Sequence, residues 1–284
     1  MAPVLAERAG AVHPVAPGRV DEIAGALLGE IDPGAPLVAL GGGRVIDTAK
    51  ALAAARPPRD RPPVAAIPTT LSAAEMTAVH RRAAGADGAL PGVRPRRVIN
   101  DPALSASQPA AELAASAANA LAHAAEGSVT RRASPVTVLT GREAARLVGT
   151  AYADAHGDEP DRDTLALAAL LSGYTIDSAG YGLHHVVSQT LARFAGVGHG
   201  QANAVMLPHT LAALERRGAP DAGRLVALAT DLARRAEAVR LRELGVGEAA
   251  LDRCADAAAD RSELDQTPPR PDRDELRALY AAAY

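Results

Sequence analysis

The side chains best suited to chemistry in this sequence are polar residues spaced four apart in its C-terminal half. Asn119 and His123 form one such pair, and His185 and Gln189 form another. On a helix, residues four apart lie on one face, so each pair directs two polar groups to one place. Imidazoles change protonation near neutral pH, so we take His185 and His199 as the candidate acid and base. We expect His123, Asn119 and Gln189 to position a substrate oxygen. The alternative for any single histidine is a buried structural residue.

A second group of residues has the pattern of a phosphate-binding loop. An apolar run at residues 36–40 ends at Gly41-Gly42-Gly43, and helical spacing follows through residues 45–55. Glycines let backbone amides approach a phosphate, and the N-terminus of the next helix favours an anion. Lys50, the only lysine of the chain, lies in that helix, which raises the question of what an ammonium does there that a guanidinium cannot. An ordinary tight turn is the alternative for the glycines.

Thr69 and Thr70 follow the next apolar run, at residues 64–67. Hydroxyl groups at the carboxyl end of a parallel strand are well placed for phosphate or sugar oxygens. The alternative is that Thr70 or Ser72 caps the start of a helix, with Glu75 in its first turn.

The elements that must position these residues change in character along the chain. Apolar runs at 36–40, 64–67 and 97–100 alternate with helical patterns at 20–31 and 45–55, which predicts a parallel sheet. A short edge strand is expected at 10–13. Ala/Leu-rich helical patterns then occupy 110–127, 141–155, 164–179, 184–195, 202–216, 222–241 and 272–284. We therefore predict an α/β domain at 1–106 and an all-helical domain at 107–284, with the ligand cleft between them.

Composition excludes several classes of protein and site. Cys254 is the only cysteine, so no internal disulfide and no cysteine-cluster metal site is expected. The net charge of −3 and an aromatic content of 2% argue against a nucleic-acid partner. No apolar run is long enough to span a membrane, and the first residues lack a signal-peptide layout. We expect a cytoplasmic protein with a small-molecule substrate and no membrane partner.

Taken together and in order, these motifs resemble the iron-containing alcohol dehydrogenase family, and its maleylacetate reductase branch most closely. The segments that carry the resemblance are Gly41-Gly42-Gly43 with Asp47 and Lys50, Pro68-Thr69-Thr70, Asn100-Asp101-Pro102, Asn119 to Glu126, Gly182 to His185, and His199 to His209. The match extends from about residue 11 to the C-terminus. It implies a dehydroquinate synthase-like fold, in which a Rossmann-like α/β domain precedes an all-α domain.

The resemblance also implies roles for individual residues. In the family, NAD(P) is bound by the α/β domain, which corresponds to Gly41, Gly42, Gly43, Asp47, Lys50, Thr69 and Thr70 here. Iron or zinc is held by one aspartate and three histidines, and His123, His185 and His199 match the histidines. Asn119 stands where metal-dependent members have Asp, as it does in the metal-independent maleylacetate reductases. A neutral amide is a poor ligand for a hard cation, so we expect neither iron nor zinc.

Other departures fall on the cofactor side of the site. Gln189 replaces a histidine near the nicotinamide, Arg44 replaces a small serine, and Ala73-Ala74 replaces Gly-Ser. The family also begins with a strand, a helix and a strand before the equivalent of residue 11, a βαβ-like length of roughly 50 residues. We therefore expect an incomplete, truncated dinucleotide platform here. The sheet edge left open by it predicts a homodimer.

Three functions follow from these expectations. The first is an enzyme without a cofactor that uses its histidines for a non-redox step on a carbonyl-containing intermediate of specialised metabolism. That step is a cyclisation, isomerisation, addition or elimination. The second is a metal-independent NAD(P)H-dependent reductase of a conjugated keto acid. The third is a catalytically silent relative that binds a metabolite.

Overall fold

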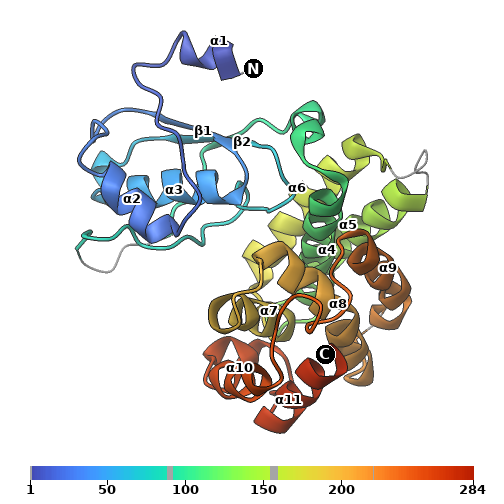
Figure 1. Ribbon diagram of the computed structural model, residues 1–284. Helices are drawn as coiled ribbons and strands as arrows, with labels where there is room; N and C mark the ends of the chain where they lie inside the picture. The colour runs from blue at the N-terminus through green and yellow to red at the C-terminus, as the bar shows by residue number, and fades with distance from the viewer. Residues whose placement is uncertain (1, 88–91, 154–158, 220) are drawn as a thin grey trace. The chain divides into compact units, whose positions relative to one another are not determined.

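The computed structural model describes residues 2–87, 92–153, 159–219 and 221–284 (Figure 1). The chain divides into two compact units. The first comprises Met1–Thr70 and Ala74–Ser105, and the second comprises Leu71–Ala73 and Ala106–Tyr284. The main junction, between Ser105 and Ala106, is one residue from the domain boundary that the sequence suggests. Each unit has its own core and is described by itself.

The first unit is built on a parallel sheet of three strands in the order β1-β2-β3. The strands are β1 (Leu37–Gly41), β2 (Val64–Pro68) and β3 (Arg97–Val98), and the helices are α1 (Ala2–Ala6), α2 (Val20–Leu27) and α3 (Gly43–Ala54). Short 3₁₀ turns are η1 (Pro58–Asp60) and η2 (Pro102–Ser107). Leu37 pairs with Val64 and Gly41 with Pro68, so both polar loops begin at the same edge of the sheet.

One face of this sheet is covered and forms the core of the unit. Alternate residues Ala39, Val64 and Ala66 point to that face and pack against Ile46 and Ala53 of α3. Helix α2 lies beside α3, as Figure 1 shows, and closes a smaller cluster around Ala24. The expected α/β alternation is therefore confirmed. The expected edge strand at 10–13 is wrong, because those residues make no strand pairing in the described part of the chain.

Lys50 is completely buried in this unit, and its ammonium group makes short polar contacts in several directions. It donates hydrogen bonds to the carbonyl oxygens of Ala74 and Val79, at 2.9 and 2.7 Å, and to the Asp47 carboxylate at 2.8 Å. The Thr77 hydroxyl lies at 3.4 Å. An ammonium has three N–H donors that diverge tetrahedrally, which matches acceptors on three sides. Lys50 therefore ties the segment after β2 to α3.

The second unit consists of helices. They are α4 (Ala110–Gly127), α5 (Pro135–Ala153), α6 (Arg162–Ala179), α7 (Leu183–Phe194), α8 (His199–Arg216), α9 (Ala222–Arg235), α10 (Ala249–Ala259) and α11 (Arg273–Ala282), with a 3₁₀ turn η3 (Ser262–Gln266). Helix α4 is almost entirely buried and contacts α5, α6, α7, α8 and α9. Its alanines let the neighbouring helices approach closely, which compensates for the scarcity of aromatic side chains.

The predicted helices of this unit are present, with three larger differences. Helix α5 begins at Pro135, well before the predicted start at 141, because proline suits the first position of a helix. Helix α10 was not predicted, since its apolar positions are mostly alanine and give a weak periodic signal. Helix α9 ends at Arg235, earlier than expected, and Ala238 and Leu241 pack into the core from the turns that follow. The end of the predicted helix at 141–155 lies outside the described residues. Within the described residues, none of the helices is both long and apolar enough to cross a membrane.

Candidate functional site

The centre of the candidate site is a buried pair formed by Glu126 of α4 and His185 of α7. His185 Nδ1 lies 2.6 Å from Glu126 Oε2, and both side chains are almost completely buried. The same carboxylate accepts the backbone N–H of His184 at 2.6 Å and that of His185 at 3.4 Å. Glu126 thus caps the N-terminus of α7, where the helix dipole favours negative charge. This capping fixes the orientation of the His185 ring.

His184 faces away from that pair and belongs to a separate buried network. Its Nε2 lies 3.1 Å from Asn203 Oδ1, and its Nδ1 lies 2.9 Å from the Thr210 hydroxyl. Asn203 Nδ2 donates to the His199 carbonyl at 3.0 Å, which leaves Asn203 Oδ1 as the acceptor for His184 Nε2–H. His184 therefore anchors α7 to α8.

Three buried polar atoms on α4 and α7 have no hydrogen-bond partner among the described residues: Asn119 Oδ1, His123 Nδ1 and His185 Nε2. The rings of His123 and His185 are stacked, with centroids 4.8 Å apart and planes 13° from parallel. Asn119 lies one turn before His123 on the same face of α4. A buried polar atom without a partner costs about 1–3 kcal/mol, so such a cluster indicates a place where a ligand supplies the bonds.

The protonation states follow from burial. Burial lowers the pKa of His185 to about 3, and it lowers the pKa of His123 well below its ordinary value. Burial also raises the pKa of Glu126, although the backbone N–H groups that it accepts oppose the shift. A neutral His185 that donates Nδ1–H to an ionised Glu126 satisfies these contacts. His185 Nε2 then carries a lone pair directed away from Glu126.

The two other predicted residues of this site lie at its margin. His199, the first residue of α8, is exposed, and its Nε2 lies 3.2 Å from Asn203 Nδ2. Gln189 is half-buried and accepts a hydrogen bond from Arg261 at 3.1 Å. The structure thus brings Asn119, His123 and His185 together and leaves His199 outside their buried cluster.

The side chains that match the metal positions of the family include no carboxylate, the ligand that a hard divalent cation prefers. In the part of the chain that the structure describes, no group of three or more His, Cys, Asp or Glu side chains is placed to hold a metal ion. Asn119 supplies a neutral amide where the metal-dependent members have a carboxylate. His199 is exposed, and its Nε2 lies 3.2 Å from Asn203 Nδ2. Without an anionic ligand the charge of a hard cation is left uncompensated.

The predicted cofactor residues lie together in the first unit at the ends of β1 and β2. Helix α3 begins at Gly43, with Gly42 as its N-cap. A Cβ atom on Gly42 would lie 3.3 Å from the Thr70 hydroxyl, and that hydroxyl is buried without a partner among the described residues. A helix N-terminus beside a free hydroxyl suits a phosphate. Thr69 donates its backbone N–H to the Gly41 carbonyl at 3.1 Å and so joins the two loops.

Lys50 and Asp47 bond each other inside the unit, so the ammonium donors are used by protein acceptors. The Arg44 side chain is exposed in the first turn of α3. At the other substituted loop position, Ala73 has a backbone φ of 62°, which is a conformation that glycine adopts more easily than alanine. Position 73 therefore has a backbone conformation typical of glycine but carries an alanine.

Gly182 is the tightest position next to the histidines. A Cβ atom there would lie 2.2 Å from the Thr267 hydroxyl, which accepts the Leu183 backbone N–H at 2.9 Å. We expect Gly182→Ala to lower the free energy of unfolding by about 1–3 kcal/mol, because the start of α7 must move. Urea denaturation measures the loss. If Gly182→Ala lowers the free energy of unfolding equally in a protein that already carries Thr267→Ala, the steric explanation is wrong. Gly149→Ala, at an uncrowded helix position, is the control.

Several residues of the site were not expected to have roles. Glu126 was noted only as part of a motif, although it continues the Asn119 and His123 face of α4. Arg261 and Glu263 surround Gln189 and Tyr181 but lie far from them in sequence. No local spacing connects them, so only the tertiary structure identifies them.

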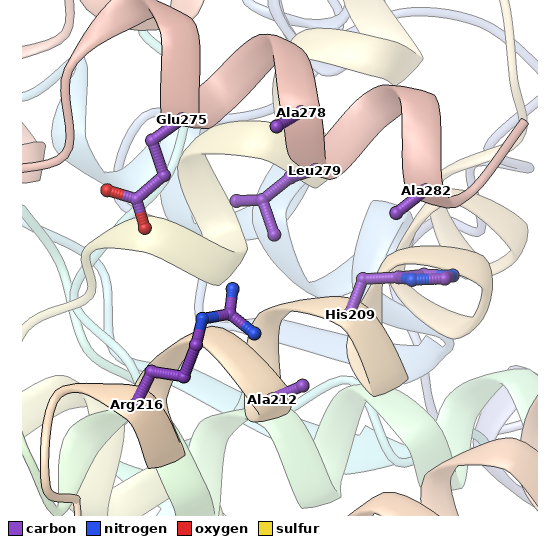
Figure 2. A pocket seen from close by; sticks show the side chains of 7 residues that line it. All are labelled: His209, Ala212, Arg216, Glu275, Ala278, Leu279 and Ala282. Carbon is purple, nitrogen blue, oxygen red and sulfur yellow. The ribbon is translucent and has the colours of Figure 1, made fainter.

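A groove elsewhere in the second unit has a volume of about 280 Å³ (Figure 2). It runs between α8 and α11, and its lining is His209, Ala212, Arg216, Glu275, Ala278, Leu279 and Ala282. The Arg216 side chain extends across it toward Leu279 in Figure 2. None of the predicted site residues lines this groove, so it is distinct from the histidine cluster.

Comparison with known proteins gives consistent matches over both units. Residues 20–87 match the family model described as "Iron-containing alcohol dehydrogenase". Residues 113–238 match "Fe-containing alcohol dehydrogenase family, C-terminal". The chain is similar to a maleylacetate reductase of Pseudomonas aeruginosa, with 32% identity over 269 residues, 87% of this chain and 73% of that protein.

Solved structures agree with the sequence matches. The maleylacetate reductase from Rhizobium sp. strain MTP-10005 has a TM-score of 0.76 and 30% identity, over 88% of this chain and 74% of that one. The sulfoacetaldehyde reductase from Bifidobacterium kashiwanohense, solved in complex with NAD+, has a TM-score of 0.75 over 93% of this chain and 79% of that one. Its identity of 23% makes it a likeness of fold alone.

Proposed function

Because this chain belongs to the iron-containing alcohol dehydrogenase family, we propose that it is a metal-independent, NAD(P)H-dependent reductase of a small conjugated keto acid. The cluster of unpartnered Asn119, His123 and His185 atoms carries the proposal. The sequence relatives named maleylacetate reductases support the reductase over the other functions considered. The asparagine at position 119 supports a mechanism without a metal.

The residues of α4 act on the substrate oxygen. The Asn119 amide directs its N–H₂ into the cluster when its O and N positions are exchanged, and His123 has an imidazole N–H. In that orientation both donate hydrogen bonds to a carbonyl oxygen placed against them. In a buried site such donors stabilise negative charge that develops on the oxygen, and removing one such donor in an enzyme costs on the order of 10²–10³ in rate. These neutral donors take over the polarising role that a cation has in metal-dependent relatives.

His185 moves the proton. Its Nδ1–H is held by Glu126, so Nε2 is the only ring nitrogen free to exchange a proton with the substrate. Burial favours the neutral ring, and the Glu126 carboxylate stabilises the imidazolium that forms when Nε2 takes up a proton. A reduction adds one proton to the substrate along with the hydride, so the pair would take that proton from solvent at Nε2 and pass it to the substrate.

The first unit would hold the cofactor. Backbone N–H groups at the start of α3 and the Thr70 hydroxyl would bind its phosphates, in a space that the lack of a Cβ on Gly42 leaves open. Bound NAD(P)H would supply the hydride. Lys50 and Asp47 would stabilise the loop through their hydrogen bonds within the unit and would not contact the phosphates.

Calorimetric titration with NADH and NADPH tests the cofactor. We expect micromolar binding of one of them, and about tenfold weaker binding by Gly42→Ala, whose methyl group would lie against Thr70. Gly29→Ala is the matched control in the same unit, because no atom lies within 4 Å of its added Cβ. Turnover is measured with maleylacetate as the loss of NADH absorbance. Absence of binding by both nucleotides would contradict the reductase.

A non-redox step is the second candidate, and the unprotonated Nε2 of His185 favours it. A lone pair held in place beside two oxygen-binding donors is suited to removing a proton next to a carbonyl group. Such a base would serve the isomerisation, elimination, addition or cyclisation that the sequence suggested. Exchange of substrate protons with D₂O in the absence of nucleotide would support this candidate. A protein that binds maleylacetate without turnover or exchange would instead be a silent metabolite-binding relative.

A further inference from the structure

We propose that Arg261, with Gln189, binds the carboxylate of the substrate in a subsite beside Tyr181, one helical turn of α7 from His185. This inference rests on the proposed function for the location of the reaction. Arg261 follows α10 and precedes η3, and it bonds Tyr181, whose ring lies against His185.

Arg261 is held in a fixed orientation by its neighbours. Its Nε and Nη2 atoms donate to the Glu263 carboxylate at 3.0 and 2.6 Å, as a two-point contact. Nη2 also lies 3.2 Å from the Tyr181 hydroxyl and 3.1 Å from Gln189 Oε1, so its two N–H groups serve three acceptors. A guanidinium anchored at one edge loses little side-chain entropy when it binds a second anion. The group is thus organised before any ligand arrives.

The opposite edge of the guanidinium is open. Nη1 makes no hydrogen bond to any residue that the structure describes, and the Arg261 side chain is 27% exposed. The two N–H groups of Nη1 are donors that suit a carboxylate oxygen. Gln189 directs its Oε1 at Arg261 and donates one amide N–H to the Tyr181 hydroxyl, so its second amide N–H is a further donor. Together these groups offer several donors to one anion.

Tyr181 connects this subsite to the histidine cluster. Its hydroxyl donates to Glu263 Oε1 at 3.1 Å and accepts from Arg261. Its ring lies against His185, with centroids 5.6 Å apart and planes at 49°. Gln189 is also one helical turn after His185 on α7. Arg261 is therefore joined to His185 through a single intervening residue on two routes, Tyr181 and Gln189.

Glu263 limits how strongly the subsite attracts an anion. The Arg261 guanidinium beside it lowers the pKa of Glu263 to about 2, so the carboxylate is ionised at neutral pH and offsets the arginine charge. A ligand carboxylate consequently meets a site with oriented donors but little net charge. Neutralising Glu263 should strengthen anion binding, whereas a purely structural role for the pair predicts the opposite.

Calorimetric titration with maleate, a simple dicarboxylate, tests the subsite without nucleotide and without turnover. We expect Arg261→Gln to weaken maleate binding at least tenfold, and Glu263→Gln to strengthen it several-fold. Arg273→Gln, which removes an equally ion-paired arginine at the start of α11, is the control for net charge and should leave binding unchanged. Dimethyl maleate, which carries no charge, should bind all variants equally weakly.

Unchanged maleate binding by Arg261→Gln would overturn the subsite, and so would weaker binding by Glu263→Gln. The second variant keeps the test valid if the first does not fold. With maleylacetate as substrate, Arg261→Gln should raise KM more than it lowers kcat. Failure of the reductase assay with normal maleate binding would contradict the proposed function but leave the subsite standing.

Discussion

Replacement of Glu126 by Gln is expected to lower kcat by about 10³-fold with little change in the fold. In the native chain Glu126 accepts the Nδ1–H of His185, which leaves a lone pair on Nε2. A glutamine amide at that place donates to Nδ1 and so favours the tautomer with the proton on Nε2. The imidazolium also loses its counter-charge. Related substitutions in other enzymes cost on the order of 10⁴ in kcat.

His185→Ala should abolish turnover, since it removes the proton-carrying group altogether. Steady-state kinetics with maleylacetate and the nucleotide that binds would measure both variants, and circular dichroism would check folding. Glu112→Gln, an equivalent change in the first turn of the same helix, is the matched control and should leave kcat unaltered. Normal kcat in Glu126→Gln would show that the buried pair is structural.

Replacement of Lys50 should have the largest effect on stability. Lys50→Met leaves the carbonyl oxygens of Ala74 and Val79 without their donor, and each unsatisfied buried group costs about 1–3 kcal/mol. We therefore expect a loss of about 2–5 kcal/mol in the free energy of unfolding, measured by urea denaturation. The segment at residues 74–79 should also become sensitive to limited proteolysis, because its anchor is gone.

Lys50→Arg distinguishes charge from shape. It keeps the positive charge, but a planar guanidinium is larger than an ammonium and cannot direct donors to acceptors on three sides of a closed space. We expect Lys50→Arg to lower the free energy of unfolding by about as much as Lys50→Met does. Arg44→Met, an exposed change on the same helix, should cost less than about 0.5 kcal/mol. Full stability of Lys50→Arg would show that the charge alone is needed.

These expectations answer the question that the single lysine raised. The sequence located Lys50 in a helix after a glycine loop, and the family resemblance favoured a phosphate contact. In the structure its ammonium is enclosed by protein acceptors, 0% exposed. Which groups the Lys50 ammonium reaches depends on the path of the segment after β2. That path is irregular, so the sequence has no periodic pattern from which to predict it.

The sequence alone predicted the α/β unit, the helical unit and the pairing of Asn119 with His123. These features depend on local rules, namely the 2-residue and 3.6-residue periods and the i, i+4 geometry of a helix. The sequence also identified His185 as a reactive candidate, because it and Gln189 are four residues apart on one helix face.

Only the tertiary structure decided how these residues work. It brought Glu126 under the first turn of α7, where one carboxylate caps the helix and orients His185. It placed His199 at an exposed helix start, and it brought Arg261 to Gln189 from a distant turn. Such contacts join segments far apart in the chain, so they depend on how helices pack. The sequence thus determined which side chains are available for chemistry, and helix packing determined which of them share a buried site.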